Sequence, residues 1–283
     1  RTSITQESLR SVAQVEGLSL EELRLRGCKE LTHYSVEVLC KHQPGLQILD
    51  LSACTELTNL SVGAIATYLP GLVVLRLGWC KEITDWGLLD MVEPTKESEP
   101  NKEMVREGWV GKSYDHAPLT EGASLLALRS LQDLDLSACS KLTDSSITQV
   151  LCYPDLQRLS LSMLPEISDD SLASVAYHCH SLTSLELSHC PHISDQGITR
   201  AAPYLARLQH LYLSCCNCVT AVNLCSHRSL SMLVQHCKRL RTLDISMCKH
   251  ISLTTVELLQ SQLPFIENVH CRFVGGADLT LLL

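Results

Sequence analysis

The sequence predicts an α/β solenoid in which a parallel sheet lines the concave side and helices cover the convex side. Three observations favour this fold. A leucine-containing motif recurs at a nearly constant period, each copy changes from strand-like to helix-like spacing, and the chain is 45% hydrophobic but only 4% aromatic. Because few rings are available to fill a sandwich or barrel, an architecture built from leucine repeats is favoured.

The repeated motif reads L-x-x-L-x-L-x-x-C-x-x-[IL]-[ST]-D. Its copies begin at Leu20, Leu46, Leu72, Leu131, Leu156, Leu182, Leu208 and Leu240, with a degenerate copy from Ile266. Most neighbouring copies begin 26 residues apart, which lies within the range of leucine-rich repeats. We expect residues 1–283 to form one solenoid of about eight full repeats and a degenerate last one. The long interval between the third and fourth copies predicts an insertion near residues 93–124.

The first half of each copy alternates as a strand does. In the fourth copy, Leu134 and Leu136 are expected to point into the core, while Asp133, Asp135 and Ser137 point outward. Each copy therefore contributes one short strand to the sheet.

The second half of each copy begins with the pattern of a helix N-terminus. A Ser or Thr hydroxyl is expected to cap the first free amides, and the Asp that follows favours the positive end of the helix dipole. The clearest pairs are Thr84-Asp85, Thr143-Asp144, Ser168-Asp169 and Ser194-Asp195. Apolar residues then recur at helical spacing, which predicts a face directed at the sheet.

Seven copies place a cysteine at the ninth position. These residues are Cys28, Cys54, Cys80, Cys139, Cys190, Cys216 and Cys248. One copy has Leu164 instead, which indicates a buried packing position, because free cysteine usually behaves as a small apolar group. A chain with this much apolar sequence does not need disulfides to hold its core, so we expect reduced thiols and a cytoplasmic or nuclear location.

The outward residues of the strands form the concave face, which is the expected binding surface. The candidate binding residues are Arg24, Asp50, Arg76, Trp79, Asp133, Asp135, Arg158, Glu186, Tyr212, Asp244 and His270. Acids and bases are interleaved along this face, and the chain has a net charge of -8, so neither nucleic acid nor a membrane is an expected partner. A protein partner is expected, with Trp79 and Tyr212 as anchors.

No motif predicts catalysis, a cofactor or a metal. Gly111-Lys112-Ser113 is similar to the end of a phosphate loop, but the first glycine of that motif would fall at Arg106. Cysteines and histidines cluster between Cys215 and Cys237, yet their spacing matches no common zinc pairing.

The cysteine-containing repeat unit resembles the repeats of the F-box/LRR family over nearly the whole chain. This resemblance implies a non-catalytic substrate receptor of an SCF ubiquitin ligase, in which the repeats hold the target and an F-box binds the adaptor and cullin. No L-P-x-E motif of an F-box occurs in these residues, so an F-box is expected upstream. The alternative is a non-ligase interaction scaffold or inhibitor.

Overall fold

The strands form one parallel sheet in a computed structural model that describes residues 5–91, 123–220, 228–263 and 265–274. They follow one another in chain order as β1 (Glu22–Arg24), β2 (Ile48–Asp50), β3 (Val74–Arg76), β4 (Asp133–Asp135), β5 (Arg158–Ser160), β6 (Ser184–Glu186), β7 (His210–Tyr212), β8 (Thr242–Asp244) and β9 (Asn268–His270). The central residue of each strand pairs with the central residue of the next, as Leu49 does with Leu75. The motif therefore fixes the register of the whole sheet.

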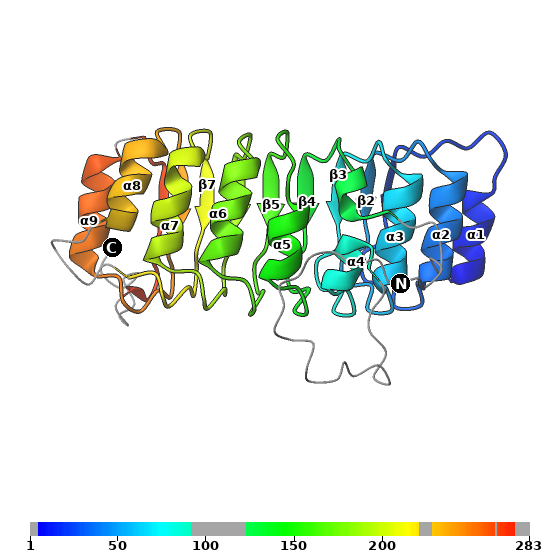
Figure 1. Ribbon diagram of the computed structural model, residues 1–283, viewed down its shortest axis with the longest axis horizontal. Coiled ribbons are helices and arrows are strands. Elements are labelled where there is room, and N and C mark those ends of the chain that lie inside the picture. The colour runs from blue at the N-terminus through cyan, green and yellow to red at the C-terminus, as the bar shows by residue number, and fades with distance from the viewer. Residues whose placement is uncertain (1–4, 92–122, 221–227, 264, 275–283) are drawn as a thin grey trace, which may run out of the picture.

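Helices form a second layer over one face of the sheet, side by side along the array (Figure 1). They are α1 (Gln6–Ala13), α2 (His33–His42), α3 (Asn59–Tyr68), α4 (Asp85–Leu89), η2 (Leu125–Ala127), α5 (Asp144–Val150), α6 (Asp169–His178), α7 (Asp195–Ala201), η3 (Ala202–Tyr204), α8 (Arg228–His236) and α9 (Leu253–Gln262). The predicted α/β solenoid with a concave sheet and convex helices is confirmed. The predicted insertion lies almost entirely outside the described residues.

The core consists of the motif leucines and the ninth-position cysteines. Leu131, Leu134 and Leu136 are fully buried, and so is Cys139. The predicted burial of these cysteines is confirmed in every copy except the first, where Cys28 is only partly buried. Burial raises the pKa of Cys80 to about 12, so such a thiol stays protonated.

The buried thiols also form hydrogen bonds that the sequence did not predict. The Sγ–H group of Cys139 donates to the carbonyl of Leu77 at 3.2 Å, and Cys80 donates to Leu51 at 3.3 Å. Equivalent bonds join Cys54, Cys190, Cys216 and Cys248 to the preceding repeat. Leu164 occupies the same position without a donor, so packing is the general requirement and the thiol bond an addition to it.

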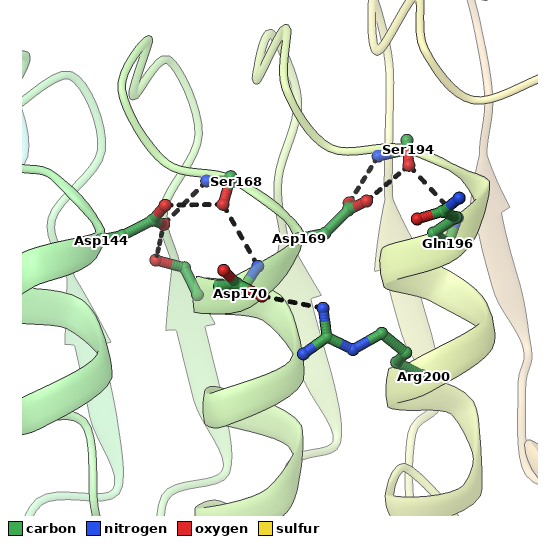
Figure 2. A network of polar contacts seen from close by, with 8 residues as sticks. Asp144, Ser168, Asp169, Asp170, Ser194, Gln196 and Arg200 are labelled. Atoms are coloured by element: carbon green, nitrogen blue, oxygen red, sulfur yellow. Dashed lines mark hydrogen bonds and ion pairs between the residues drawn. The ribbon is translucent and has the colours of Figure 1, made fainter.

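A ladder of aspartates joins successive repeats at the helix N-termini (Figure 2). The carboxylate of Asp144 accepts the backbone N–H of Ser168 at 2.8 Å and its hydroxyl at 2.6 Å, and also accepts the hydroxyl of Ser171. Asp169 likewise accepts the N–H and hydroxyl of Ser194, at 2.7 and 2.5 Å. Asp85 and Asp195 repeat the arrangement. Asp85, Asp144 and Asp169 therefore each hold the residue that precedes the next helix, namely Thr143, Ser168 and Ser194.

The predicted caps are confirmed at three of the four pairs. The side chains of Thr143, Ser168 and Ser194 each accept a backbone N–H two residues later. The expectation is wrong at Thr84, which makes no side-chain cap bond. Its hydroxyl accepts from the amide of Asn59 at 2.8 Å instead, because this repeat follows one with asparagine in the ladder position.

Replacing Gly197 with alanine tests how tightly the ladder is packed. A Cβ at this position would clash with Oδ1 of Asp169, and that carboxylate is held by Ser194. Helix propensity alone would make alanine more stable by about 1 kcal/mol. We expect the opposite sign, a loss of about 1 kcal/mol in the free energy of unfolding, measured by urea denaturation. Gly63→Ala, a helical control whose added Cβ meets nothing within 4 Å, is expected to stabilise.

The N-terminal end of the solenoid leaves apolar side chains uncovered. Val12 and Val15 are 45% and 52% exposed, and Leu18 is also exposed. Behind them the buried side-chain amide of Gln43 donates to the carbonyls of Ala13 and Leu18, which ties the end of α1 and the segment after it to the end of α2.

Candidate protein-binding surface

The concave face is formed by the first and third residues of each strand, since the central residue points into the core. The third positions hold eight of the predicted binding residues: Arg24, Asp50, Arg76, Asp135, Glu186, Tyr212, Asp244 and His270. Asp133 and Arg158 occupy first positions, and Trp79 lies just beyond the end of β3. The register therefore sets these side chains in rows that cross the strands.

A carboxylate between two arginines lies at the centre of this face. Oδ2 of Asp133 is 2.8 Å from the guanidinium of Arg76 and 3.0 Å from that of Arg158. Asp133 is only 5% exposed, whereas the two arginine side chains are 38% and 56% exposed. Hydrogen bonding to Asp133 raises the pKa of Arg76. The buried carboxylate of Asp133 thus holds both arginine side chains in place, while part of each remains exposed to solvent.

This triad lies in a shallow hollow of about 340 Å³. Seven of the predicted residues line it, namely Asp50, Arg76, Trp79, Asp133, Asp135, Arg158 and Glu186. Arg24, Tyr212, Asp244 and His270 are not among its lining residues. Because most of the lining is charged or hydroxylic, the hollow suits polar side chains of a protein better than an apolar small molecule.

Three of the predicted acids have a structural role that the sequence analysis missed. Asp50, Asp135 and Asp244 each accept the backbone N–H of a serine two residues later, at 2.9 Å. The signal was present as the repeated pattern D-x-S at the end of these strands. Such bonds shape the turn that leaves the strand, so only part of each carboxylate is free to meet a partner.

Trp79 stands in a turn that favours glycine. Its φ is +67°, and the same place in the other copies also has a positive φ, both at small residues such as Gly27 and Ala53 and at large ones such as Met163 and Phe273. A large side chain in this conformation is disfavoured relative to glycine. Trp79 is nevertheless 42% exposed, with the ammonium of Lys81 6.0 Å from its ring centroid. The chain therefore places a strained aromatic residue at the rim of the hollow.

The charge of the hollow does not form a phosphate-binding track. Its lining contains four acids, Asp50, Asp133, Asp135 and Glu186, and three bases, Arg26, Arg76 and Arg158. One of the acids, Asp133, is already shared by Arg76 and Arg158. Nucleic-acid backbones bind to runs of Lys and Arg, which this part of the face does not offer.

Within the part of the chain that the structure describes, no group of three His, Cys, Asp or Glu residues is arranged to hold a metal ion. Two members of the cysteine and histidine cluster, Cys225 and His227, lie outside that part. The described helices also include none long and apolar enough to cross a membrane.

Comparisons with known proteins agree with the repeat architecture. A family model described as "Leucine Rich repeat" matches residues 178–199, which contain one copy of the motif with its ninth-position cysteine. No curated protein sequence in the comparison matches the chain.

Solved structures of other proteins are similar to the chain, including the following two. Internalin C2 from Listeria monocytogenes is 17% identical with a TM-score of 0.54, and the match covers 95% of this chain and 84% of that protein. A chain in the Rad7 and Elc1 complex of yeast is 16% identical with a TM-score of 0.39, over 89% of this chain and 75% of that one. Together with the ordered parallel sheet, the internalin and the repeat match identify the fold as a leucine-rich-repeat solenoid.

Proposed function

We propose that this solenoid is a protein-binding domain that recognises its target on the concave face. The observation that carries the proposal is the Arg76–Asp133–Arg158 triad. A carboxylate buried between two partly exposed arginines fixes their positions before any partner binds, so less side-chain freedom is lost on association. Arginines are enriched at the energetic centres of protein interfaces.

The biological setting proposed for this binding is substrate recognition in an SCF-type ubiquitin ligase. Support for this step comes from the resemblance of the cysteine-containing repeat to the F-box/LRR family. In this role the chain performs no catalysis, and the adaptor and cullin bind through an F-box outside these residues. A non-ligase scaffold or inhibitor is the second candidate, because the same face would serve it equally well.

Removing the Trp79 side chain should weaken target binding without unfolding the protein. Trp79→Gly places glycine where the backbone already has a positive φ, so stability is expected to stay level or rise. We expect about tenfold weaker binding of the target, measured by calorimetry or surface plasmon resonance. Binding equal to that of the wild type would remove this rim from the proposed surface.

A charge reversal on each face of the molecule provides the matched comparison. Glu186→Arg changes the concave face, and Glu257→Arg makes the same substitution at an exposed position of α9 on the convex side. Only the first is expected to reduce target binding. Equal effects of the two variants would contradict recognition by the concave face.

The ligase setting is tested by affinity purification and mass spectrometry of the complete gene product beside residues 1–283. We expect the complete product to recover the F-box adaptor and a cullin, and the repeats alone to recover only targets. If neither recovers the adaptor, the scaffold function replaces the ligase function while concave recognition still stands.

A further inference from the structure

A tyrosine lies between two carboxylates in the C-terminal half of the concave face. Glu186 of β6, Tyr212 of β7 and Asp244 of β8 are paired in register across neighbouring strands. Adjacent strands are about 4.8 Å apart, so the phenol ring stands between the two acids. Burial raises the pKa of Tyr212, and the charges of Glu186 and Asp244 raise it further. We call these three residues the acid–tyrosine row.

The same face contains an equivalent row in which the chain supplies its own cation. Asp50, Arg76 and Asp135 are paired in register across β2, β3 and β4. Besides its bond to Asp133, Arg76 experiences the charges of Asp50 and Asp135, which also raise its pKa. A guanidinium is therefore the group that this scaffold itself places between two such carboxylates.

No comparable cation fills the acid–tyrosine row. Neither Glu186 nor Asp244 forms an ion pair with any described residue. Glu186 accepts the hydroxyl of Ser160 at 3.1 Å, and Asp244 accepts the backbone N–H of Ser246 at 2.9 Å. Each of these bonds engages only one carboxylate oxygen. Beyond Asp244 the next residue in register is the exposed His270 of β9.

We propose that the acid–tyrosine row binds an arginine side chain of the target protein. A guanidinium can stack on the Tyr212 ring while its N–H groups face the carboxylates on either side. The charge of the row complements such a group, and Arg76 shows that the same sheet can hold a guanidinium between two carboxylates in register, with its direct bond going to Asp133. This inference rests on the proposed function and adds the chemistry of the partner: a segment that presents arginine to β6–β8.

In the Tyr212→Arg variant, the arginine side chain of the protein itself is expected to occupy the acid–tyrosine row. The new guanidinium should lie between Glu186 and Asp244 as Arg76 does between its neighbours. We expect the thermal unfolding midpoint of Tyr212→Arg to equal or exceed that of the wild type. Adding Asp244→Asn to this variant should lower the midpoint, because the guanidinium then loses one of its two carboxylate neighbours. Tyr212→Phe keeps the ring and serves as the matched control. A clear fall in the midpoint of Tyr212→Arg would contradict the comparison with Arg76.

A small probe tests the row without knowledge of the target. N-acetylarginine amide is titrated into the 283-residue chain with ¹³C-labelled tyrosine, and the neutral isostere N-acetylcitrulline amide is the control. We expect the Tyr212 ring signals to shift saturably with the arginine compound and at least fivefold less with citrulline. The Glu186→Gln/Asp244→Asn variant should lose the response. Equal responses to both compounds, or none to either, would overturn the inference.

Selection of random displayed peptides on the same chain separates this inference from the proposed function. We expect selected peptides to be enriched in arginine, and the enrichment to persist on Tyr212→Phe but disappear on Tyr212→Arg. Peptides that require Trp79 and yet show no excess of arginine would refute the inference and leave concave recognition standing. Peptides indifferent to every concave variant, or no selected peptides at all, would count against both.

Discussion

Asp144→Ala is expected to lower the free energy of unfolding by about 3 kcal/mol. The carboxylate is the acceptor for the N–H and hydroxyl of Ser168 and for the hydroxyl of Ser171. The side chain of Ser171 is fully buried, so its hydroxyl would lose its partner without access to water. Urea denaturation followed by circular dichroism measures the loss. An effect no larger than that of Asp155→Ala, a control at an exposed aspartate, would contradict this role.

Asn59 is the natural asparagine at the ladder position of its repeat, so it indicates how Asp144→Asn should behave. In its own repeat Asn59 accepts the N–H of Thr84 at 2.9 Å and donates to its hydroxyl at 2.8 Å. The third ladder donor is missing there, because the residue equivalent to Ser171 is Gly87. Asp144→Asn should therefore retain roughly half of the stabilisation. Its Oδ1 can still accept from the N–H of Ser168 and the hydroxyl of Ser171, and its amide can donate to the Ser168 hydroxyl, but every bond then joins neutral groups and is weaker.

The same bonds predict how stability at this ladder position depends on pH. Burial alone would raise the pKa of Asp144, but the hydrogen bonds from Ser168 and Ser171 outweigh it, so the pKa is lowered. A carboxyl whose pKa is lower in the folded state contributes stability above its unfolded pKa, and loses it as pH falls through the folded value. The difference in the free energy of unfolding between the wild type and Asp144→Asn should therefore be present at pH 7 and shrink below about pH 4. A difference that stayed constant down to pH 2 would show that the charge of Asp144 is not involved.

The motif predicted most of the fold because the constraint it records is local. Alternation of Leu134 and Leu136 sets which side of a strand is buried, and a constant period then sets the register of every strand that follows. Leu164 at a cysteine position likewise indicates that packing is the requirement at that place in the repeat. These inferences need only the spacing of residues within one repeat.

The contacts between repeats could not be derived in this way. The sequence suggested that Asp144 acts on its own helix, but its hydrogen-bond partners lie 24 and 27 residues later. Asp133 was placed on the concave face from its alternation, yet its burial depends on Arg76, which lies 57 residues earlier across the insertion. Spacing shows which face a side chain occupies and does not show what covers it.

His33→Asp is expected to raise the free energy of unfolding by about 2 kcal/mol, because it adds a missing member to the aspartate ladder. His33 follows Thr32 at the start of α2, as Asp85 follows Thr84 at the start of α4. The donors that an aspartate would meet are already in place in the next repeat. The hydroxyls of Thr58 and Ser61 are both buried without a hydrogen-bond partner. They correspond to the Thr143 and Ser146 hydroxyls that Asp85 accepts.

A double-mutant cycle distinguishes a new ladder contact from a general effect of charge. Ser61→Ala removes a hydroxyl that has no partner in the wild type, so alone it should be neutral or slightly stabilising. In the His33→Asp background the same change should cancel part of the gain, and the coupling between the two sites measures the new bond. His250→Asp makes the same substitution at an exposed position and should have little effect. Two results would contradict this prediction: a gain in the free energy of unfolding for His33→Asp no larger than that for His250→Asp, or no coupling between positions 33 and 61. Either would show that supplying an acceptor does not satisfy the Thr58 and Ser61 hydroxyls, and that an aspartate alone does not form the ladder contact.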